Sequence, residues 1–204
     1  MALVNAYTTV EALRSRSTIT HTDRDPQLEA AVQAASRGVD RVCARRFWDS
    51  VTPSARVFHA DDPYRLYVDD FSTVTGLLVA TDEADSGSYT TTKTITTDFV
   101  CYPANGERDG LAGWPFEALE AVSFYWPTGG RRPNRVQVTA RWGWAAVPDP
   151  VSSATLIVAS ELLRLGDAPF GVILSEFGTV ARIRDNPIVM AMLAPYMRGS
   201  MVGV

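Results

Sequence analysis

The residues best suited to chemistry are few and scattered. The 204-residue chain has two histidines, His21 and His59, and neither stands in a catalytic or metal-binding spacing. Cys43 and Cys101 lie far apart, without the Cys-x-x-Cys or Cys/His patterns of zinc and redox sites. The GxSxG, GxxxxGK[ST] and GxGxxG motifs of hydrolases, phosphate loops and dinucleotide folds are all absent. The sequence therefore predicts no catalytic residue, no metal site and no cofactor.

Three short stretches imitate functional sites. His59 stands beside Asp61 and Asp62 in "VFHADD", but a histidine at a strand end next to a turn is the favoured interpretation. "DEADSG" (82–87) lacks the D-x-D-x-D-G order and the closing glutamate of a calcium loop, which predicts a hairpin turn. "TGGRRPN" (128–134) could offer backbone amides and two arginines to a phosphate, although a plain loop between strands is favoured.

A stripe of charge follows one predicted helix. Arg37, Arg41 and Arg45 recur every four residues, and Glu29 and Gln33 extend the same stripe. The arginines fall in the C-terminal half of the helix, where its dipole partly compensates their repulsion. A solvated face is the favoured interpretation. The alternative is a contact with acidic residues of a neighbouring chain.

Composition narrows the class of protein. Hydrophobic residues make up 46% and charged residues 21%, which is ordinary for a globular protein. No apolar run reaches the ~18 residues of a membrane span, and the N-terminus lacks a secretory pattern. Unpaired cysteines fit a reducing cytoplasm. The net charge of −4 argues against a protein that wraps nucleic acid.

Two helices are expected in the first 50 residues. In "TTVEALRSR", Thr8 is the expected N-cap and Glu11 its partner in a capping box. In "DPQLEAAVQAASRGVDRVCARRFW", Asp25 is the expected N-cap and Pro26 the first helical residue. The second segment carries one continuous apolar face at helical spacing, made of Leu28, Ala31, Val32, Ala35, Val39, Val42, Cys43 and Phe47.

From Arg56 to Trp142 the period drops towards two and β-branched and aromatic residues increase. Six or seven short antiparallel strands are expected, forming a small sandwich or open barrel. Their cores are "RVFHA", "YRLYVD", "GLLVATD", "SYTTTKTIT", "DFVCY", "AVSFYW" and "RVQVTARW".

Helical patterning returns at Asp149. Asp149-Pro150 and Asn186-Pro187 repeat the arrangement of a capping residue before proline. The helix that follows Pro150 is apolar on nearly all sides, so most of its surface must be covered. Either it is the central helix of one chain, or a neighbouring subunit covers part of it.

The last segment departs from a compact pattern. "GVILSEFGTVARIR" (171–184) resembles a short hairpin, and Pro195 limits the following helix to about two turns. Four of the five methionines lie here, and methionine adapts to partner surfaces. The segment either folds back on its own core or contacts another chain, and the second is favoured. The candidate protein-interface residues are Arg37, Arg41, Arg45, Phe170, Phe177, Met190, Met192, Tyr196, Met197 and Met201.

The expected fold class is α+β, with a helical body of about four helices and an inserted antiparallel β-module. The expected boundaries are 1–50 and 146–166 for the two parts of the body, 51–145 for the module, and 167–204 for a C-terminal hairpin, short helix and docking tail.

This order of elements resembles the head–tail connector (adaptor, or head-completion) proteins of long-tailed bacteriophages, of the type found in phages of actinobacteria. Three stretches carry the resemblance. They are the early helix pair ending at Arg46-Phe47, the module segment "YVDDFSTVTGLLVATDE…TTDFVCYPAN", and "RWGWAAVPDPVSSATLIVASELLRLGDAPFGV" with its landmarks Trp142-Gly143-Trp144, Val147-Pro148 and Pro169-Phe170-Gly171. The stretch "DGLAGWPFEALEAV" is longer than the corresponding loop of the family.

The resemblance implies a structural virion protein, made in the host cytoplasm, that forms a ring, typically dodecameric, beneath the portal. The ring would extend the DNA channel and offer a platform to the next connector or tail protein. Its partners would be copies of itself, the portal protein and that downstream protein, without a membrane. A ring of acidic chains would let double-stranded DNA pass without specific binding.

Two other functions stay open at this point. A virion protein could use the β-module to hold a ligand such as a glycan or to decorate the capsid, in which case Trp114, Trp126 or Trp144 would be exposed. A small hydrolase would need His21 or His59 in a pocket beside a nucleophile.

Overall fold

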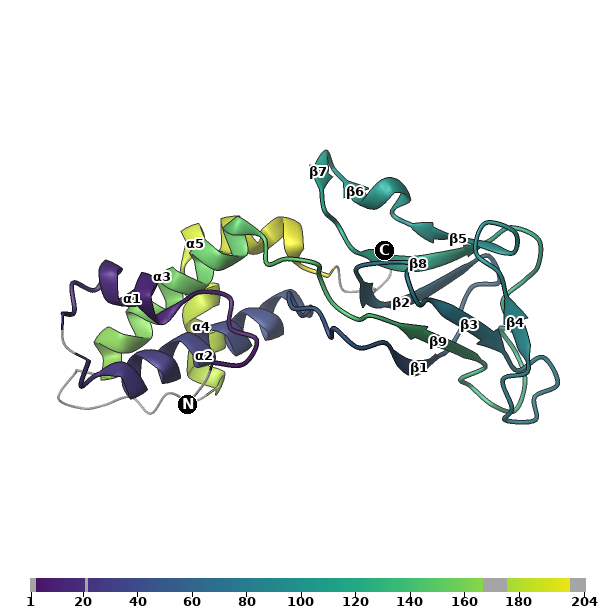
Figure 1. Cartoon of the computed structure of the whole chain (residues 1–204), viewed down its shortest axis with the longest axis horizontal. Helices are drawn as coiled ribbons and strands as arrows, with labels where there is room; N and C mark the ends of the chain where they lie inside the picture. Colours follow the sequence, from purple (N-terminus) through teal and green to yellow (C-terminus); the bar gives the residue numbers. More distant parts are fainter. Residues whose placement is uncertain (1–2, 21, 167–175, 199–204) are drawn as a thin grey trace. The chain divides into compact units, whose positions relative to one another are not determined.

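The computed structural model describes residues 3–20, 22–166 and 176–198. The chain divides into two compact units, which we call the helical unit and the β unit. The helical unit comprises Met1–Phe47 and Val147–Val204, and the β unit comprises Trp48–Ala146, inserted between those two segments. The expected α+β class is confirmed (Figure 1).

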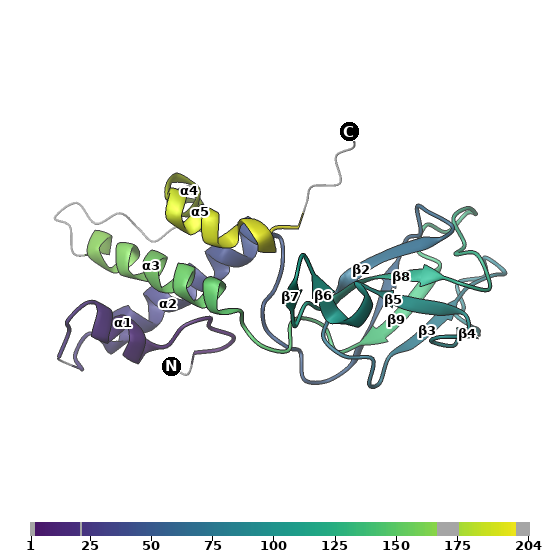
Figure 2. The ribbon, with the colours of Figure 1, turned by 90° about the horizontal axis from the view of Figure 1, so that it is seen from above.

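The helical unit contains five α-helices within its described residues: α1 (Val10–Arg16), α2 (Asp25–Cys43), α3 (Asp149–Gly166), α4 (Glu176–Asp185) and α5 (Pro187–Leu193). A 3-10 turn, Ala194–Tyr196, follows α5. Helix α3 contacts all four of the others, and α2 also packs directly against α4 (Figure 2). The unit is therefore a bundle built around α3.

The N-caps of the first two helices differ from expectation. Thr9, not Thr8, caps α1, and its hydroxyl accepts a hydrogen bond from the Ala12 backbone N–H at 3.1 Å. The residue three positions after Thr9 is an alanine, so no capping box forms. Asp25 is the first residue of α2 rather than its cap, and its carboxylate pairs with Arg14 instead.

Helix α2 buries the predicted apolar face but ends early. All the predicted face residues are buried except Val42, which is half-buried. The helix ends at Cys43 because Ala44 takes the left-handed conformation, with φ of 51°. Residues after Ala44 therefore leave the helical periodicity.

Helix α3 is the central helix of its own unit. Val151, Ala154, Val158, Ala159 and Leu162 are all at most 3% exposed within the single chain. The hydroxyls of Thr155 and Ser160 donate to carbonyls one turn earlier, so these polar groups are also satisfied internally. These residues are covered within the single chain, as the first of the two interpretations requires. Leu156, Ile157 and Leu165 of the same helix are half-buried, so the second interpretation stays a prediction.

The expected hairpin is wrong over residues 176–184, which form α4; residues 171–175 lie outside the described part of the chain. Thr179 and Ile183, four residues apart, are buried on one face of α4 and meet α2 at Gly38. A Cβ placed on Gly38 would lie 2.5 Å from Thr179 Cγ2 and 2.9 Å from Ile183 Cδ1. The β-branched residues that suggested a strand thus supply a helix face fitted against a glycine.

Helix α5 begins and ends as expected. The Asn186 side chain accepts hydrogen bonds from the backbone N–H groups of Ile188 and Val189 at 3.1 and 3.2 Å. The helix has seven residues, and Pro195 stands in the 3-10 turn that follows it.

The β unit contains two main antiparallel sheets. Sheet A has the order β1-β9-β3-β4, and sheet B the order β2-β8-β5. The strands are β1 (Ser54–Phe58), β2 (Arg65–Phe71), β3 (Leu78–Thr81), β4 (Thr91–Lys93), β5 (Phe99–Tyr102), β8 (Phe116–Ala121) and β9 (Val136–Ala140). A third, two-stranded sheet pairs β6 (Glu107–Arg108) with β7 (Leu111–Ala112).

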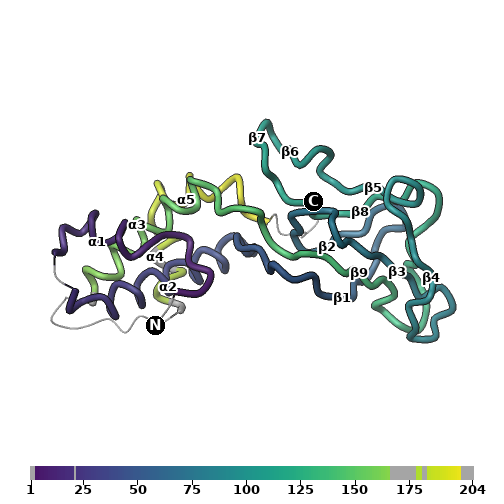
Figure 3. The backbone as a smooth tube through the Cα atoms, in the orientation of Figure 1, coloured from purple at the N-terminus to yellow at the C-terminus, as the bar shows by residue number. Residues whose placement is uncertain are grey.

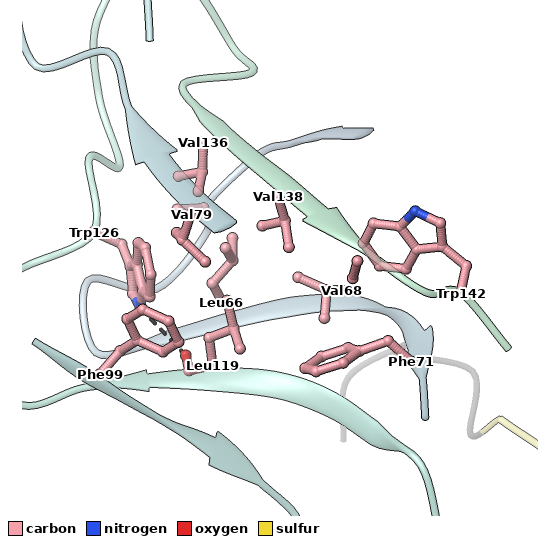
Figure 4. Packing of buried hydrophobic residues seen from close by; sticks show 12 residues of the cluster. Leu66, Val68, Phe71, Val79, Phe99, Leu119, Trp126, Val136, Val138 and Trp142 are labelled. Atoms are coloured by element: carbon pink, nitrogen blue, oxygen red, sulfur yellow. Dashed lines mark hydrogen bonds between the residues drawn. The ribbon is translucent and has the colours of Figure 1, made fainter. Parts of the chain in front are cut away.

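The two main sheets share one core, so the unit is the expected small sandwich. Val79, Val136 and Val138 of sheet A face Leu66 and Leu119 of sheet B across it, and Figure 4 shows these side chains between the strands. Trp126 closes the core, and its Nε1 donates to the Leu119 carbonyl at 3.2 Å.

Two segments of the β unit differ from the sequence pattern. The strand expected in "AVSFYW" lies earlier, at Phe116–Ala121, and only Ala121 is shared. The long stretch after Glu107 forms the β6–β7 hairpin, in which Asp109 and Gly110 have φ of 52° and 78°. Positive φ at both central residues is the signature of a two-residue type I′ hairpin turn.

The segments that begin and end the β unit run side by side, as the tube in Figure 3 shows. The Ser50 backbone N–H donates to the Trp142 carbonyl at 2.8 Å, and the Trp142 N–H donates to Ser50 Oγ at 2.9 Å. Arg141 pairs with Asp49 across the same contact. These bonds join the two ends of the module before the chain returns to the helical unit.

Candidate assembly interface

The histidine candidate has the surroundings of a surface residue. His59 is exposed directly after β1, and its Nε2 lies 3.3 Å from Asp61 Oδ1 while Nδ1 contacts the Pro133 carbonyl oxygen. The interpretation as a strand-end histidine beside a turn is confirmed. His21 lies outside the described residues.

The acidic stretch 82–87 is the expected turn, between β3 and β4. The Asp82 carboxylate accepts hydrogen bonds from the backbone N–H groups of Ser86 at 2.9 Å and Gly87 at 2.6 Å. Burial alone would raise the pKa of Asp82, but these hydrogen bonds outweigh it and hold that pKa below its usual value. Within the described residues, no group of three or more His, Cys, Asp or Glu side chains could hold a metal ion.

The loop 128–134 uses its amides inside the chain. The Arg131 and Arg132 backbone N–H groups donate to the Asp85 carboxylate at 2.6 and 3.1 Å. Arg135 fastens the same two loops through its guanidinium, which donates to the carbonyls of Asp82 and Glu83 at 2.8 Å each. A carboxylate of the protein therefore occupies the position that a phosphate would take, and the plain-loop interpretation is confirmed.

The three arginines of the α2 stripe lie in three different environments. Arg37 turns to its own chain, donating to the Asn5 carbonyl at 2.6 Å and pairing with Asp40 at 3.2 Å. Arg41 is exposed. Arg45 is only 5% exposed, because the helix has ended at Cys43 and the four-residue spacing no longer places it on the stripe. A continuous solvated stripe is therefore wrong, and of the three arginines only Arg41 is exposed.

A buried polar cluster beside the stripe was not predicted. Tyr7, 3% exposed, donates its hydroxyl to the Asp40 carboxylate and accepts from the Phe47 backbone N–H at 2.9 Å. Burial raises the pKa of Asp40, although the Tyr7 hydrogen bond and Arg37 partly oppose it. Burial, with the Asp40 charge, also raises the pKa of Tyr7 well above its usual value. In the sequence, the only trace of this cluster is a tyrosine ahead of α1 and an acid on α2.

The C-terminal candidates divide into packed and half-exposed residues. Val189, Leu193 and Tyr196 are buried in the helical unit, and the Tyr196 ring meets Phe47 edge-on at 6.1 Å. Met190, Met192 and Met197 are half-buried. Helix α5 and its 3-10 turn therefore fold back on the chain's own core. The half-buried methionines stay candidates for an interface.

Three candidates cannot be placed in this way. Phe170 and Met201 lie outside the described residues, and Phe177 belongs to α4 but its side chain is outside the description. Ile188, on the exposed side of α5, is 63% accessible, and it is not among the candidates predicted from the sequence.

The tryptophans of the β unit do not form a ligand platform. Trp114, Trp126 and Trp144 are 5%, 1% and 3% exposed. Trp144 Nε1 donates to the buried Asp70 carboxylate at 3.0 Å, and its ring meets Trp114 edge-on at 4.9 Å. Buried rings argue against the alternative in which the module binds a glycan on exposed tryptophans.

No protein-family model and no curated protein matches the sequence. Solved structures do match the fold along the whole chain. One is a chain in the neck of an empty gene transfer agent (GTA) particle, a structure with C6 symmetry, with a TM-score of 0.57 and 17% identity. Another is from the neck of a native GTA particle with C12 symmetry, with a TM-score of 0.56 and 16% identity. Each match covers 100% of this chain and 96% of the neck chain.

The chain has the fold of a particle-neck protein. The resemblance expected from the sequence is thus confirmed at the level of the fold, since gene transfer agents are phage-like particles. The neck-protein fold spans both the helical unit and the inserted β unit, because no large part of either chain is left unmatched.

None of the described helices is long and apolar enough to cross a bilayer.

Proposed function

We propose that this chain is a non-catalytic head–tail adaptor of a phage or phage-like particle. Copies assemble into a ring beneath the portal protein, extend the channel through which DNA passes, and form the platform for the next connector or tail protein. The protein would therefore reside in the virion, at the junction of head and tail.

The end-to-end fold match carries this proposal. A helical unit alone is a common arrangement, but a helical unit interrupted by a sandwich of this kind, matched over 100% of the chain, is a much more specific one. The landmarks Trp142-Gly143-Trp144 add weight, because each has a structural task. Trp142 and Trp144 are buried in the β unit, and Gly143 lets two segments meet.

The symmetry of the neighbours, C6 in the empty neck and C12 in the native neck, supports a ring. The native GTA neck has C12 symmetry, and the family resemblance implies the same number for this chain. A net charge of −4 per copy makes such a ring strongly acidic. Duplex DNA would slide through it rather than bind, because binding relies on cations that neutralise phosphates.

Mass photometry of the purified chain, alone and mixed with the portal protein of the same particle, tests the proposal. We expect a stable complex with the portal that contains several copies of this 22.3 kDa chain. Absence of any complex, with a correctly folded chain and an intact portal ring, would contradict the adaptor role. The variant Arg41→Glu tests the exposed arginine of the α2 stripe, and unaltered assembly would remove this residue from the interface.

A further inference from the structure

The outer face of sheet A carries no charge. The strand register places one set of side chains on the core and the alternate set on the outside. Val136, Val138 and Val79 point inward and are at most 1% exposed. The alternate positions form the face that we call face A, made of Ala55, Val57, Leu78, Ala80, Thr92, Gln137 and Thr139.

This lack of charge contrasts with the rest of the β unit. The unit contains eight Lys or Arg residues and 13 Asp or Glu residues, a net charge of −5. On face A, Leu78 is 63% and Val57 45% exposed, at positions where a solvent-facing sheet usually carries polar residues. Face A is therefore uncharged and partly aliphatic within an acidic unit.

The cations of the edge strands of sheet A are turned to its other side. Arg56 of β1 lies over the Trp142 ring at 4.5 Å from its centroid, and Lys93 of β4 lies over the Phe124 ring at 4.3 Å. Only 11% of the Lys93 side chain is accessible. Inward-pointing charges on edge strands oppose strand-to-strand pairing with another chain. A partner would therefore meet the face of this sheet rather than its edges.

Sheet B has an outer face of complementary character, which we call face B. Its strand members are Arg65, Tyr67, Val100, Tyr102, Ala118 and Glu120, of which Ala118 is 0% exposed, and Val122 directly follows β8. Tyr67, Tyr102 and Val122 are 45%, 39% and 60% exposed. Its charges are paired: Arg65 pairs with Glu120 while its guanidinium lies over the Tyr102 ring at 4.8 Å, and Asp69, two residues after Tyr67 on β2, pairs with Arg56 at 2.6 Å.

We propose that face A of one copy packs against face B of the next copy in the ring. This inference rests on the proposed adaptor function and names the contact between the β units. A head-to-tail contact joins two different surfaces of the same chain, and the two outer faces of a two-sheet sandwich supply such a pair.

The charge distribution of the β unit favours a second copy of the chain as the partner of face A. Units of net charge −5 repel one another, so copies approach most favourably through surfaces that are uncharged or internally neutralised. Face A has no cation for nucleic acid to bind. The Thr92, Gln137 and Thr139 side chains supply hydrogen-bond partners for the hydroxyls of Tyr67 and Tyr102 when both faces are buried.

Two arginine substitutions test the contact, with a matched control. Leu78→Arg disrupts face A and Tyr102→Arg disrupts face B, whereas Leu111→Arg places the same charge on the separate β6–β7 hairpin, where Leu111 is 41% exposed. All three side chains are accessible to solvent, so the substitutions should leave the core of the β unit intact. Circular dichroism of each variant checks that it is folded. Mass photometry then measures assembly of the full chain over a range of concentrations, with and without portal protein.

Each face variant should lower the apparent association constant between copies by about tenfold or more, and Leu111→Arg should leave it unchanged. Because each face variant retains one intact face, an equimolar mixture should form heterodimers that neither variant forms alone. A two-fold contact between identical faces predicts no such rescue and would overturn the proposal.

The remaining outcomes separate this inference from the adaptor function. If both face variants assemble like the wild type, the contact is wrong and the adaptor function stands. If they form normal rings but fail to hold a downstream protein, the faces serve that protein instead, which also overturns the inference. If the wild type neither associates nor binds portal, the adaptor function itself fails.

Discussion

The carbonyl oxygen of Trp48 occupies the space in which a side chain of residue 143 would begin. A Cβ built on Gly143 would lie 1.7 Å from that oxygen, and Gly143 has φ of +107°. The two segments that bound the β unit can meet only because one of them carries a glycine there.

The variant Gly143→Ala should therefore lose about 2 kcal/mol or more of the free energy of unfolding, through backbone strain and the clash with Trp48. Urea unfolding followed by tryptophan fluorescence measures the loss. Gly129→Ala is the control, because nothing lies within 4 Å of a Cβ at Gly129. Equal stability of the two variants would contradict this account.

Gly38→Ala should destabilise the helical unit by about 1–3 kcal/mol, because the new methyl group would overlap Thr179 Cγ2 in α4. This overlap outweighs the roughly 1 kcal/mol by which alanine exceeds glycine in helix propensity. Thr179→Ser removes the nearer methyl group, so the double variant should recover part of the loss, while the approach to Ile183 Cδ1 at 2.9 Å remains. A stabilising effect of Gly38→Ala alone in thermal unfolding would show that the α2–α4 contact is looser than described.

The Tyr7–Asp40 pair predicts a pH dependence of stability. Because the pKa of Asp40 is raised in the folded chain, the folded state binds the proton more tightly than the unfolded state. Its contribution is therefore fully present below the unfolded pKa of about 3.9 and is lost as the pH rises through the folded pKa.

Asp40→Asn keeps an acceptor for the Tyr7 hydroxyl and removes this titration. The difference in free energy of unfolding, wild type minus Asp40→Asn, should fall between pH 4 and pH 7. Tyr7→Phe removes a hydrogen bond that lowers the pKa of Asp40, so it should steepen the fall. Urea titrations at both pH values test this, and a difference that rises with pH would reverse the assigned direction.

Asp85→Ala should loosen the loop 128–134, because the Arg131 and Arg132 amides lose their acceptor. Faster hydrogen exchange at these two amides is the expected result, with a loss of about 1 kcal/mol in stability. Asp61→Ala, an exposed acid in another turn, is the control. Unchanged exchange would mean that Arg135 alone holds the loop.

Deletion of Met190–Val204 should unfold the helical unit rather than leave a folded monomer. The deletion removes Leu193 and Tyr196, which are 0% and 7% exposed, and each large buried side chain contributes about 2–5 kcal/mol. Truncation after Arg198 retains both and should keep a cooperative transition in circular dichroism. A folded Met190–Val204 deletion would show that α5 is dispensable to the core.

The sequence predicted those features in which local pattern and burial agree. The buried face of α2, the Asn186 cap and most strands followed from spacing alone. The hairpin expected near Thr179 was wrong because its β-branched residues serve a helix that packs on Gly38, 141 positions earlier, a contact that no local window contains. Arg45 does not lie on the predicted stripe, because Ala44 takes a left-handed conformation, which the presence of an alanine does not predict.

The site was predicted less fully than the fold. Interface candidates were chosen for adaptability and charge, yet Tyr196 and Arg45 are core residues of the single chain. Face A could not be recognised from sequence, because its seven residues come from four strands and share only a lack of charge. The strand register is what places them together.

The adjacency of Ser50 and Trp142 has an evolutionary consequence. Because the first and last segments of the β unit lie next to each other, the whole unit can be inserted into, or removed from, a helical protein at a single position in its chain. The helical unit would keep its packing when the β unit is inserted or removed, since α3 is in contact with the other four helices of its own unit. Gain or loss of the whole sandwich would therefore leave the packing of the helical unit unchanged.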